Sequence, residues 1–149
     1  MKLQIFYDNT LYKFRGWRKV KGLVDAIIRS EEKIPGEISF IITSDDYLRT
    51  VNKEFLKHDY FTDVISFNYS FGDNVAGEIY ISEDTVRRNA VEYNVDFDNE
   101  MLRVMIHGVL HLAGYNDGTN KEKQEMRRLE DKWMKFFFPK EKSEKNTSK

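Results

Sequence analysis

Two of the three histidines in this 149-residue chain are spaced to bind one metal ion. His107 and His111 lie four residues apart in an apolar stretch, and residues four apart lie on the same face of a helix. Gly114 follows where a glycine can end the helix in the left-handed conformation and reverse the chain. Asp117 comes three residues later, where its carboxylate could return to the same ion. The motif His-x3-His-x2-Gly-x2-Asp therefore predicts three ligands, His107, His111 and Asp117.

Three protein ligands leave the fourth position of a tetrahedral zinc site open, which is the pattern of catalytic zinc. A zinc ion there would acidify a metal-bound water and polarise a carbonyl or phosphoryl oxygen, so the expected chemistry is hydrolysis. Zinc peptidases carry a glutamate as general base directly after the first histidine, and this chain has Gly108 there. The sequence therefore argues against a peptidase and leaves the general base unidentified.

A second interpretation of the same residues needs no metal. Two histidines in a buried helix can make hydrogen bonds within the core, and Asp117-Gly118 is a common turn signal. However, two imidazoles on an otherwise apolar helix are costly to bury, and a glycine and a carboxylate follow where a third ligand would be needed. We therefore expect one zinc ion (Zn2+) per chain.

Three blocks of the sequence resemble the YbeY family of bacterial metal-dependent endoribonucleases. The first block, Met105–Asp117 (MIHGVLHLAGYND), is similar to the family signature HGxLHLxGYDH. The other two are Asn52–Phe67, which contains NKEF, Asp59 and TDVISF, and Gly77–Ser82 (GEIYIS). The resemblance implies a single-strand-specific endoribonuclease that acts in the maturation of small-subunit (16S) ribosomal RNA and in ribosome quality control.

The resemblance also implies partners, and two residues depart from the family pattern. The implied partners are single-stranded RNA, the small ribosomal subunit and its assembly factors, with no DNA and no membrane. The family's third zinc ligand is usually a histidine, and this chain has Asp117, although a carboxylate is also a competent zinc ligand. The family usually has an arginine, thought to contact substrate phosphate, where this chain has Leu56. A non-catalytic, zinc-stabilised ribosome-assembly or RNA-binding module is therefore the main alternative to the nuclease, and a zinc peptidase is the third.

Four further residues are candidates to line a cleft around the metal. Asp63 and Ser66 lie at the start of a predicted strand, although polar residues there are more often turn formers or face solvent. Lys57 could supply a point charge for phosphate, but not the bidentate fork of an arginine. Tyr115 could contact substrate or pack over the end of the helix. The third histidine, His58, is expected to be an exposed loop residue.

Hydrophobic periodicity predicts the elements that must position these side chains. We expect strands at residues 2–7, 37–43, 63–69 and 76–81, of which the last two form an antiparallel hairpin. We expect five helices, of which the first runs from residue 17 to before Pro35, and the second starts at a Ser44 cap and buries Leu48, Val51 and Phe55. The third runs from a Ser82 cap to about Asn94, and the fourth, which is buried on several sides, runs from an Asp98 cap to about Ala113. The fifth runs from a Thr119–Glu122 capping box to Pro139. This order predicts an α+β domain in which a small four-stranded mixed sheet packs against about five helices.

Composition and charge limit the class of protein further. With 40% hydrophobic residues the chain can form a core, so we expect one catalytic domain over residues 1–139 and a disordered polar tail over 140–149. The lack of cysteine and of long apolar runs indicates a cytoplasmic protein. Net charge is −1, but residues 1–34 carry 8 basic and 4 acidic side chains, 35–100 carry 5 and 14, and 101–149 carry 11 and 7. Any RNA must therefore be held by local basic patches and the metal, because the overall field is nearly neutral.

Overall fold

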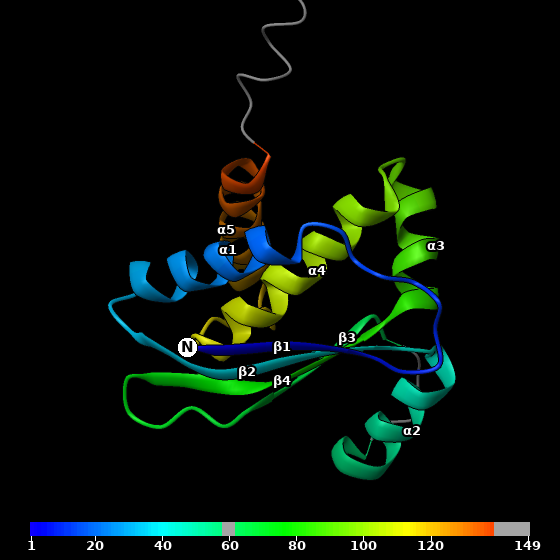
Figure 1. Cartoon of the computed structure of the whole chain (residues 1–149), viewed down its shortest axis with the longest axis horizontal. Helices are drawn as coiled ribbons and strands as arrows, with labels where there is room; N and C mark the ends of the chain where they lie inside the picture. Colours follow the sequence, from blue (N-terminus) through cyan, green and yellow to red (C-terminus); the bar gives the residue numbers. More distant parts are fainter. Residues whose placement is uncertain (58–61, 139–149) are drawn as a thin grey trace, which may run out of the picture.

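A four-stranded mixed sheet lies at the centre of the protein (Figure 1). The computed structural model describes residues 1–57 and 62–138. The strands β1 (Lys2–Tyr7), β2 (Ile34–Thr43), β3 (Val64–Asn68) and β4 (Asn74–Ser82) lie in the order β1-β2-β4-β3. Both β1 and β4 pair with β2 in parallel, whereas β3 pairs with β4 as an antiparallel hairpin. The predicted mixed sheet and its hairpin are therefore confirmed.

Five helices in the described residues cover this sheet unequally. The helices α1 (Trp17–Ser30), α4 (Phe97–Leu112) and α5 (Asn120–Phe137) form a layer on one face, where α4 contacts β3 and β4 directly (Figure 1). On the opposite face, α2 (Asp45–Leu56) packs against β3 and β4. The helix α3 (Glu83–Tyr93) packs beside α4, on the same side of the sheet as α4 (Figure 1). This arrangement confirms the predicted α+β class. None of the described helices is long and apolar enough to cross a bilayer.

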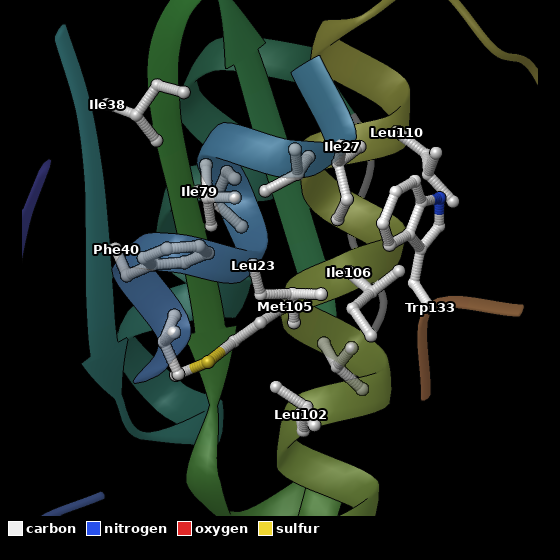
Figure 2. Packing of buried hydrophobic residues seen from close by; sticks show 14 of the residues in the cluster. Leu23, Ile27, Ile38, Phe40, Ile79, Leu102, Met105, Ile106, Leu110 and Trp133 are labelled. Carbon is white, nitrogen blue, oxygen red and sulfur yellow. The ribbon is translucent and has the colours of Figure 1, made fainter. Parts of the chain in front are cut away.

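The main core lies between the sheet and the layer of α1, α4 and α5. Figure 2 shows Phe40 and Ile79 of the sheet facing Leu23 of α1 and Met105 of α4, with Trp133 of α5 beside Ile106 on the side of α4 away from the sheet. Ten of the sixteen residues of α4 are buried, which confirms that this helix is enclosed on several sides. Because its surroundings are apolar, the polar side chains on α4 must find partners on its one remaining face.

Local signals for the ends of helices are confirmed at three caps. The hydroxyls of Ser44 and Ser82 accept hydrogen bonds from the main-chain N–H groups of Tyr47 and Thr85, respectively. Thr119 and Glu122 form the predicted capping box at the start of α5. Each hydroxyl satisfies an N–H group that the first turn of a helix leaves without a partner.

The predicted start of α4 is wrong by two residues. The helix begins at Phe97 with Asp96 as its cap, and Asp98 accepts a hydrogen bond from the Tyr12 hydroxyl at 2.8 Å instead of capping the helix. The ring of Phe97 packs edge-on against Tyr12, with centroids 4.8 Å apart. This long-range contact fixes the start of the helix, and a pattern of local residues does not contain it.

Two further expectations differ from the structure. Phe55 is 66% exposed, because Asn52 takes the buried place beside Leu48 and Val51, and the Phe55 ring meets the edge of Phe67 instead. Strand β2 starts at Ile34 rather than residue 37, with a shift of register between Pro35 and Ile38. The predictions for His58, for the helix end at Pro139 and for the tail over 140–149 fall outside the described residues.

Candidate metal centre

The two histidines of α4 point at one another from successive turns. Their Nε2 atoms lie 3.0 Å apart, and both side chains are partly exposed, at 21% for His107 and 26% for His111. The other faces of α4 are packed against the sheet and against α3 and α5. The helix therefore presents both imidazoles at its one polar face, as the spacing predicts.

A tight turn after α4 returns Asp117 to these histidines. Gly114 has φ +112°, a conformation that side chains rarely adopt, and the N–H of Tyr115 bonds to the carbonyl of Leu110. One oxygen of Asp117 then lies 3.3 Å from Nε2 of His107, and the other lies 3.5 Å from Nε2 of His111. Across the described residues, these three are the one group of His, Cys, Asp or Glu side chains close enough to share an ion.

The spacing of the three ligand atoms fits a zinc ion. A tetrahedral ion with bonds of about 2.0–2.1 Å holds its ligand atoms about 3.3 Å apart. The two Nε2 atoms here lie 3.0 Å apart, one Asp117 oxygen lies 3.3 Å from Nε2 of His107, and the other Asp117 oxygen lies 3.5 Å from Nε2 of His111. These distances are of the size that a tetrahedral ion bound by two imidazole nitrogens and the Asp117 carboxylate requires.

Hydrogen bonds on the far side of each ring fix which nitrogen carries the proton. Nδ1 of His111 lies 2.8 Å from the main-chain oxygen of Tyr115, and Nδ1 of His107 lies 2.7 Å from a carboxylate oxygen of Glu130. A carbonyl and a carboxylate only accept, so each Nδ1 donates its proton to them. Both Nε2 atoms of the neutral rings are thus unprotonated and face each other and Asp117. Three electron-pair donors converge there, an arrangement that favours a cation or an added proton between them.

The electrostatics of His107 also favour positive charge at this point. Burial lowers the pKa of His107, but the hydrogen bond and the charge of Glu130, together with Asp117 and Asp63, outweigh it and raise the pKa overall. Burial raises the pKa of Asp63, and the His107 charge offsets part of that effect. Acidic groups therefore surround the histidines on several sides.

Gly108 lets α4 approach the sheet closely enough to bring the histidines beside β3. A Cβ atom at this position would lie 2.6 Å from Cγ2 of Ile79 on β4. No side chain, and so no glutamate, fits at residue 108 without moving the helix or the strand. The structure therefore excludes the peptidase arrangement, in which a general base follows the first histidine.

Two pockets meet at the histidine–aspartate cluster. One, of about 440 Å³, lies between β3 and the end of α4, and the other, of about 330 Å³, lies among α3, α4 and α5. His107, Asp117 and Asp63 line both pockets, so the cluster and one extra carboxyl stand between them. Ser66 lines the β3 pocket only.

The other two candidates for the cleft lie outside both pockets. Lys57 ends α2 in an exposed left-handed conformation. The ring of Tyr115 packs against the main core and its hydroxyl donates to Glu31 at 2.8 Å, so only its main-chain oxygen serves the site, by holding His111. Leu56 lines the β3 pocket, and among the described lining residues that pocket has no lysine or arginine.

Glu130 is the site residue that sequence reasoning missed. It is 5% exposed, bonds to Nδ1 of His107 through one oxygen and accepts from Arg103 through the other at 3.2 Å. Its burial could have been predicted from the sequence, because it stands four residues after Met126 and three before Trp133 on the buried stripe of α5. A carboxylate at a core position needs a buried partner, and that signal points toward the histidines.

Comparisons with known proteins place these residues in a family. The family model described as Endoribonuclease YbeY matches residues 8–137. A protein named Endoribonuclease YbeY from Flavobacterium psychrophilum is 48% identical over 118 residues, which is 79% of this chain and 84% of that protein. Another of the same name, from Chloroherpeton thalassium, is 43% identical over 136 residues, or 91% of this chain and 96% of that protein.

A solved structure gives the same result for the fold. The solution structure of TM1509 from Thermotoga maritima superposes with a TM-score of 0.65 and 29% identity, covering 95% of this chain and 93% of that one. The three blocks that resemble YbeY and the histidine–aspartate cluster all lie within the span that the family model matches. The chain therefore belongs to the YbeY family of endoribonucleases, hydrolases that act on RNA.

Proposed function

We propose that this protein is a zinc-dependent, single-strand-specific endoribonuclease that acts in the maturation of small-subunit (16S) ribosomal RNA and in ribosome quality control. His107, His111 and Asp117 would hold the zinc ion. The family match supports cleavage of RNA, and the chemistry of the three ligand atoms supports zinc. We also propose that its partners are the small ribosomal subunit and its assembly factors, and that it works in the cytoplasm.

One observation carries the proposal of a metal centre. The partners of both Nδ1 atoms leave two unprotonated nitrogens and a carboxylate within 3.5 Å of one another. Without a positive charge between them, these electron pairs repel. A zinc ion bound there would act as a Lewis acid, which would polarise a phosphoryl oxygen and acidify an attacking water.

The chain's own residues supply the rest of the site. Asp63 lines both pockets beside His107, and its raised pKa suits a carboxyl that takes up or gives a proton near the reacting phosphate. Lys123 and Arg127 of α5 line the other pocket, where they would meet the charge of the RNA backbone. These cations lie across the cluster from Leu56, so in this chain the phosphate-holding charge would come from α5.

The decisive experiment measures zinc content and turnover together. Purified protein is loaded with one equivalent of zinc or stripped with a chelator, and is then incubated with single-stranded RNA, with double-stranded RNA and with an unfolded protein. We expect cleavage of the single-stranded RNA by the loaded protein only. In His111→Ala and Asp117→Ala we expect loss of zinc and at least a 100-fold fall in cleavage rate.

Controls separate the alternatives. Asp25→Ala removes an exposed carboxylate of α1 that pairs with Arg29, so it should leave zinc content and cleavage unchanged. Stoichiometric zinc with no turnover of any substrate would favour the non-catalytic ribosome-assembly or RNA-binding module. That module is the main alternative because Leu56 stands in the β3 pocket where the family usually has an arginine. Cleavage of the unfolded protein would instead support a peptidase.

A further inference from the structure

The pocket between β3 and α4 is lined by a residue whose buried hydroxyl has no hydrogen-bond partner among the described residues. The pocket, of about 440 Å³, is lined by His107 and His111 on the α4 side and by Asp63 and Ser66 on the β3 side. It opens directly beside the proposed zinc ligands. A substrate with its reacting phosphate at the zinc would therefore place a neighbouring group in this pocket.

Strand β3 is an edge strand, and it contributes Val64, Ile65, Ser66 and Asn68 to the lining of this pocket. The main chain of Asp63 accepts from Ser82 and that of Tyr69 donates to Ala76, so by register the odd-numbered residues bond to β4. The main-chain groups of Ser66, between them, point toward the free edge. Its side chain lies on the α4 face, because side chains alternate and Ile65 packs on the α2 side.

The Ser66 hydroxyl has no hydrogen-bond partner among the described residues although its oxygen is buried. It is the one buried side-chain polar atom of the described chain in this condition. A buried hydroxyl without a partner is costly, and native proteins seldom keep one without a reason. A substrate group entering the pocket would supply the missing partner.

Packing places Ser66 close to the zinc ligands. Ser66 is the cross-strand neighbour of Ile79, and Ile79 fills the space above Gly108. Ser66 thus lies across from the turn of α4 that carries His107 and His111. The part of an RNA strand nearest to the reacting phosphate is the ribose, which is bonded to it directly.

The charge of the pocket also favours a sugar over a phosphate. Among the described residues that line it there is no lysine or arginine, whereas Asp63 and Asp117 carry carboxylates. A second phosphate would be repelled there, but a neutral hydroxyl would not. A serine hydroxyl can both donate and accept hydrogen bonds, and so can a ribose 2′-hydroxyl. The 2′-hydroxyl is the group that distinguishes RNA from DNA.

We propose that Ser66 binds the ribose 2′-hydroxyl of the nucleotide beside the cleaved bond, and so makes the site selective for RNA over DNA. This inference rests on the proposed function, because it assumes that RNA reacts at the histidine–aspartate cluster. Ser66 acts on the substrate and not on the metal. Its loss should therefore change the choice of sugar without changing zinc content.

The test combines one protein variant with single-atom changes in the substrate. Zinc-loaded wild type and Ser66→Ala are compared on one single-stranded RNA and on a series in which each ribose near the cleavage site is replaced in turn by 2′-deoxyribose. For the wild type we expect kcat/KM to fall about five- to tenfold at one position, the size of one neutral hydrogen bond. Ser66→Ala should show the same fall on the all-ribose RNA and no further fall at that position.

Stability and a matched serine provide the controls. Replacing an unpartnered buried hydroxyl by a hydrogen should leave the unfolding midpoint unchanged or slightly higher, so a loss of fold would contradict this account of Ser66. Ser39→Ala changes a serine of β2 whose neighbours Ile38 and Phe40 face the core, and it should keep the wild-type preference.

Two outcomes would overturn the proposal. Equal sensitivity of wild type and Ser66→Ala to 2′-deoxyribose at every position would show that another group reads the sugar. If the zinc-loaded protein cleaves no RNA, the proposed nuclease function fails. The role of Ser66 is then still tested by comparing the Kd values with which wild type and Ser66→Ala bind the ribose and deoxyribose strands. Unchanged selectivity in Ser66→Ala by that measurement would also overturn it.

Discussion

At the scale of single residues, the site depends on where protons are held. Tyr115 and Glu130 each accept the Nδ1 proton of one histidine, and the unprotonated Nε2 atoms then meet Asp117. Glu130 is the stronger of the two partners because it is charged and buried. Arg103 balances that charge through a bond of 3.2 Å. The proposed metal ligands are thus one layer of a larger polar group.

Glu130→Gln tests this second layer. The amide oxygen of glutamine can still accept from His107, but the negative charge that makes the ring a better ligand is lost. We expect zinc affinity to fall about tenfold or more, within the usual range for partners of metal ligands. Competition with a chelator of known affinity measures the change.

The matched control is Asp131→Asn. Asp131 is the other carboxylate that pairs with Arg103, at 3.0 Å, but it does not contact a histidine and is half exposed. We expect its zinc affinity to match that of wild type. Equal affinities in Glu130→Gln and Asp131→Asn would mean that the charge of Glu130 does not act on the metal.

At the scale of elements, the distance of α4 from the sheet and its position along the sheet are fixed by specific contacts. Gly108 permits the close approach to Ile79, while side chains from β3 and from the loop before β2 bond to carbonyls at the end of the helix. Asn68 of β3 donates to Leu112 at 3.2 Å, and Lys33 donates to Ala113 at 2.7 Å. These contacts set where the histidines stand relative to β3 and its pocket.

Gly108→Ala should disturb this approach. Its new Cβ would come within 2.6 Å of Ile79, so we expect a loss of about 1–3 kcal/mol in the free energy of unfolding and weaker zinc binding. Urea unfolding and zinc titration measure the two effects. Gly22→Ala is the matched control, since nothing lies within 4 Å of the added methyl group in α1, and it should be neutral or stabilising.

A double variant identifies the cause. Ile79→Ala removes the atoms that the new methyl group meets, so Gly108→Ala should cost less in that background than in wild type. Simple addition of the two losses would rule out the clash as the reason. Zinc affinity in the double variant should also lie above that of Gly108→Ala alone.

Asp45 joins the start of α2 to the start of α3. Burial raises its pKa, but hydrogen bonds from Ser82, Thr85 and Arg88 outweigh burial, so the pKa of Asp45 is lowered overall. The Thr85 and Arg88 bonds measure 2.6 and 2.8 Å. A lowered pKa means that the stabilisation is complete above the unfolded-state value and is lost as pH falls through the folded-state value.

Asp45→Asn should therefore destabilise the protein at neutral pH but not in acid. We expect a loss of about 1–2 kcal/mol near pH 7, since bonds to a charged group are removed. The difference from wild type should shrink below pH 3.8, the ordinary value for this carboxyl, and continue to shrink toward the lower folded-state pKa. A difference that stays constant down to low pH would show that the charge of Asp45 is not what stabilises the helix junction.

At the scale of the whole molecule, the proposed metal site ties distant segments together. His107 and His111 come from α4, Asp117 from the turn after it, and Glu130 from α5. Bound zinc would therefore oppose unfolding of the end of α4 and of the turn that carries Asp117, and the Glu130 bond to His107 would link α5 to this unit. Because an unfolded chain has no such preformed site, zinc affinity becomes stability of the fold.

Zinc should accordingly raise the unfolding temperature. At a free zinc concentration one thousand times Kd, we expect the free energy of unfolding to rise by about 4 kcal/mol, which raises Tm by about 10 °C for a chain of this size. The shift should vanish in His111→Ala and with a chelator. Protons compete for His107, whose pKa is raised, so the zinc effect should fade as pH drops through values somewhat above 6.5.

The stability of the zinc-free protein should depend on pH in the opposite direction. A raised pKa for His107 contributes stability that is present below 6.5 and is lost as pH rises through the folded-state value. Scanning calorimetry between pH 5 and 8 with and without zinc gives both trends. Parallel trends in the two samples would contradict binding of zinc at His107.

The sequence alone determined much of this protein, because much of it is local. The spacing of His107 and His111, the turn glycine at 114 and the caps at Ser44, Ser82 and Thr119 each depend on residues within a few positions of one another. Alternating strands and the apolar α4 also follow from periodicity, which is why the α+β class was predictable. Local geometry suffices wherever the interacting groups are neighbours along the chain.

Only the tertiary structure decided what depends on distant neighbours. The helix α4 begins at Phe97, where Tyr12, distant in sequence, packs against the Phe97 ring. Phe55 is exposed because Asn52 takes the buried place beside Leu48 and Val51. The same holds for Glu130 at His107 and for the buried Ser66 hydroxyl beside the cluster. A pattern of residues states which side chains are polar, but the satisfaction of a buried polar group depends on the atoms that folding brings around it.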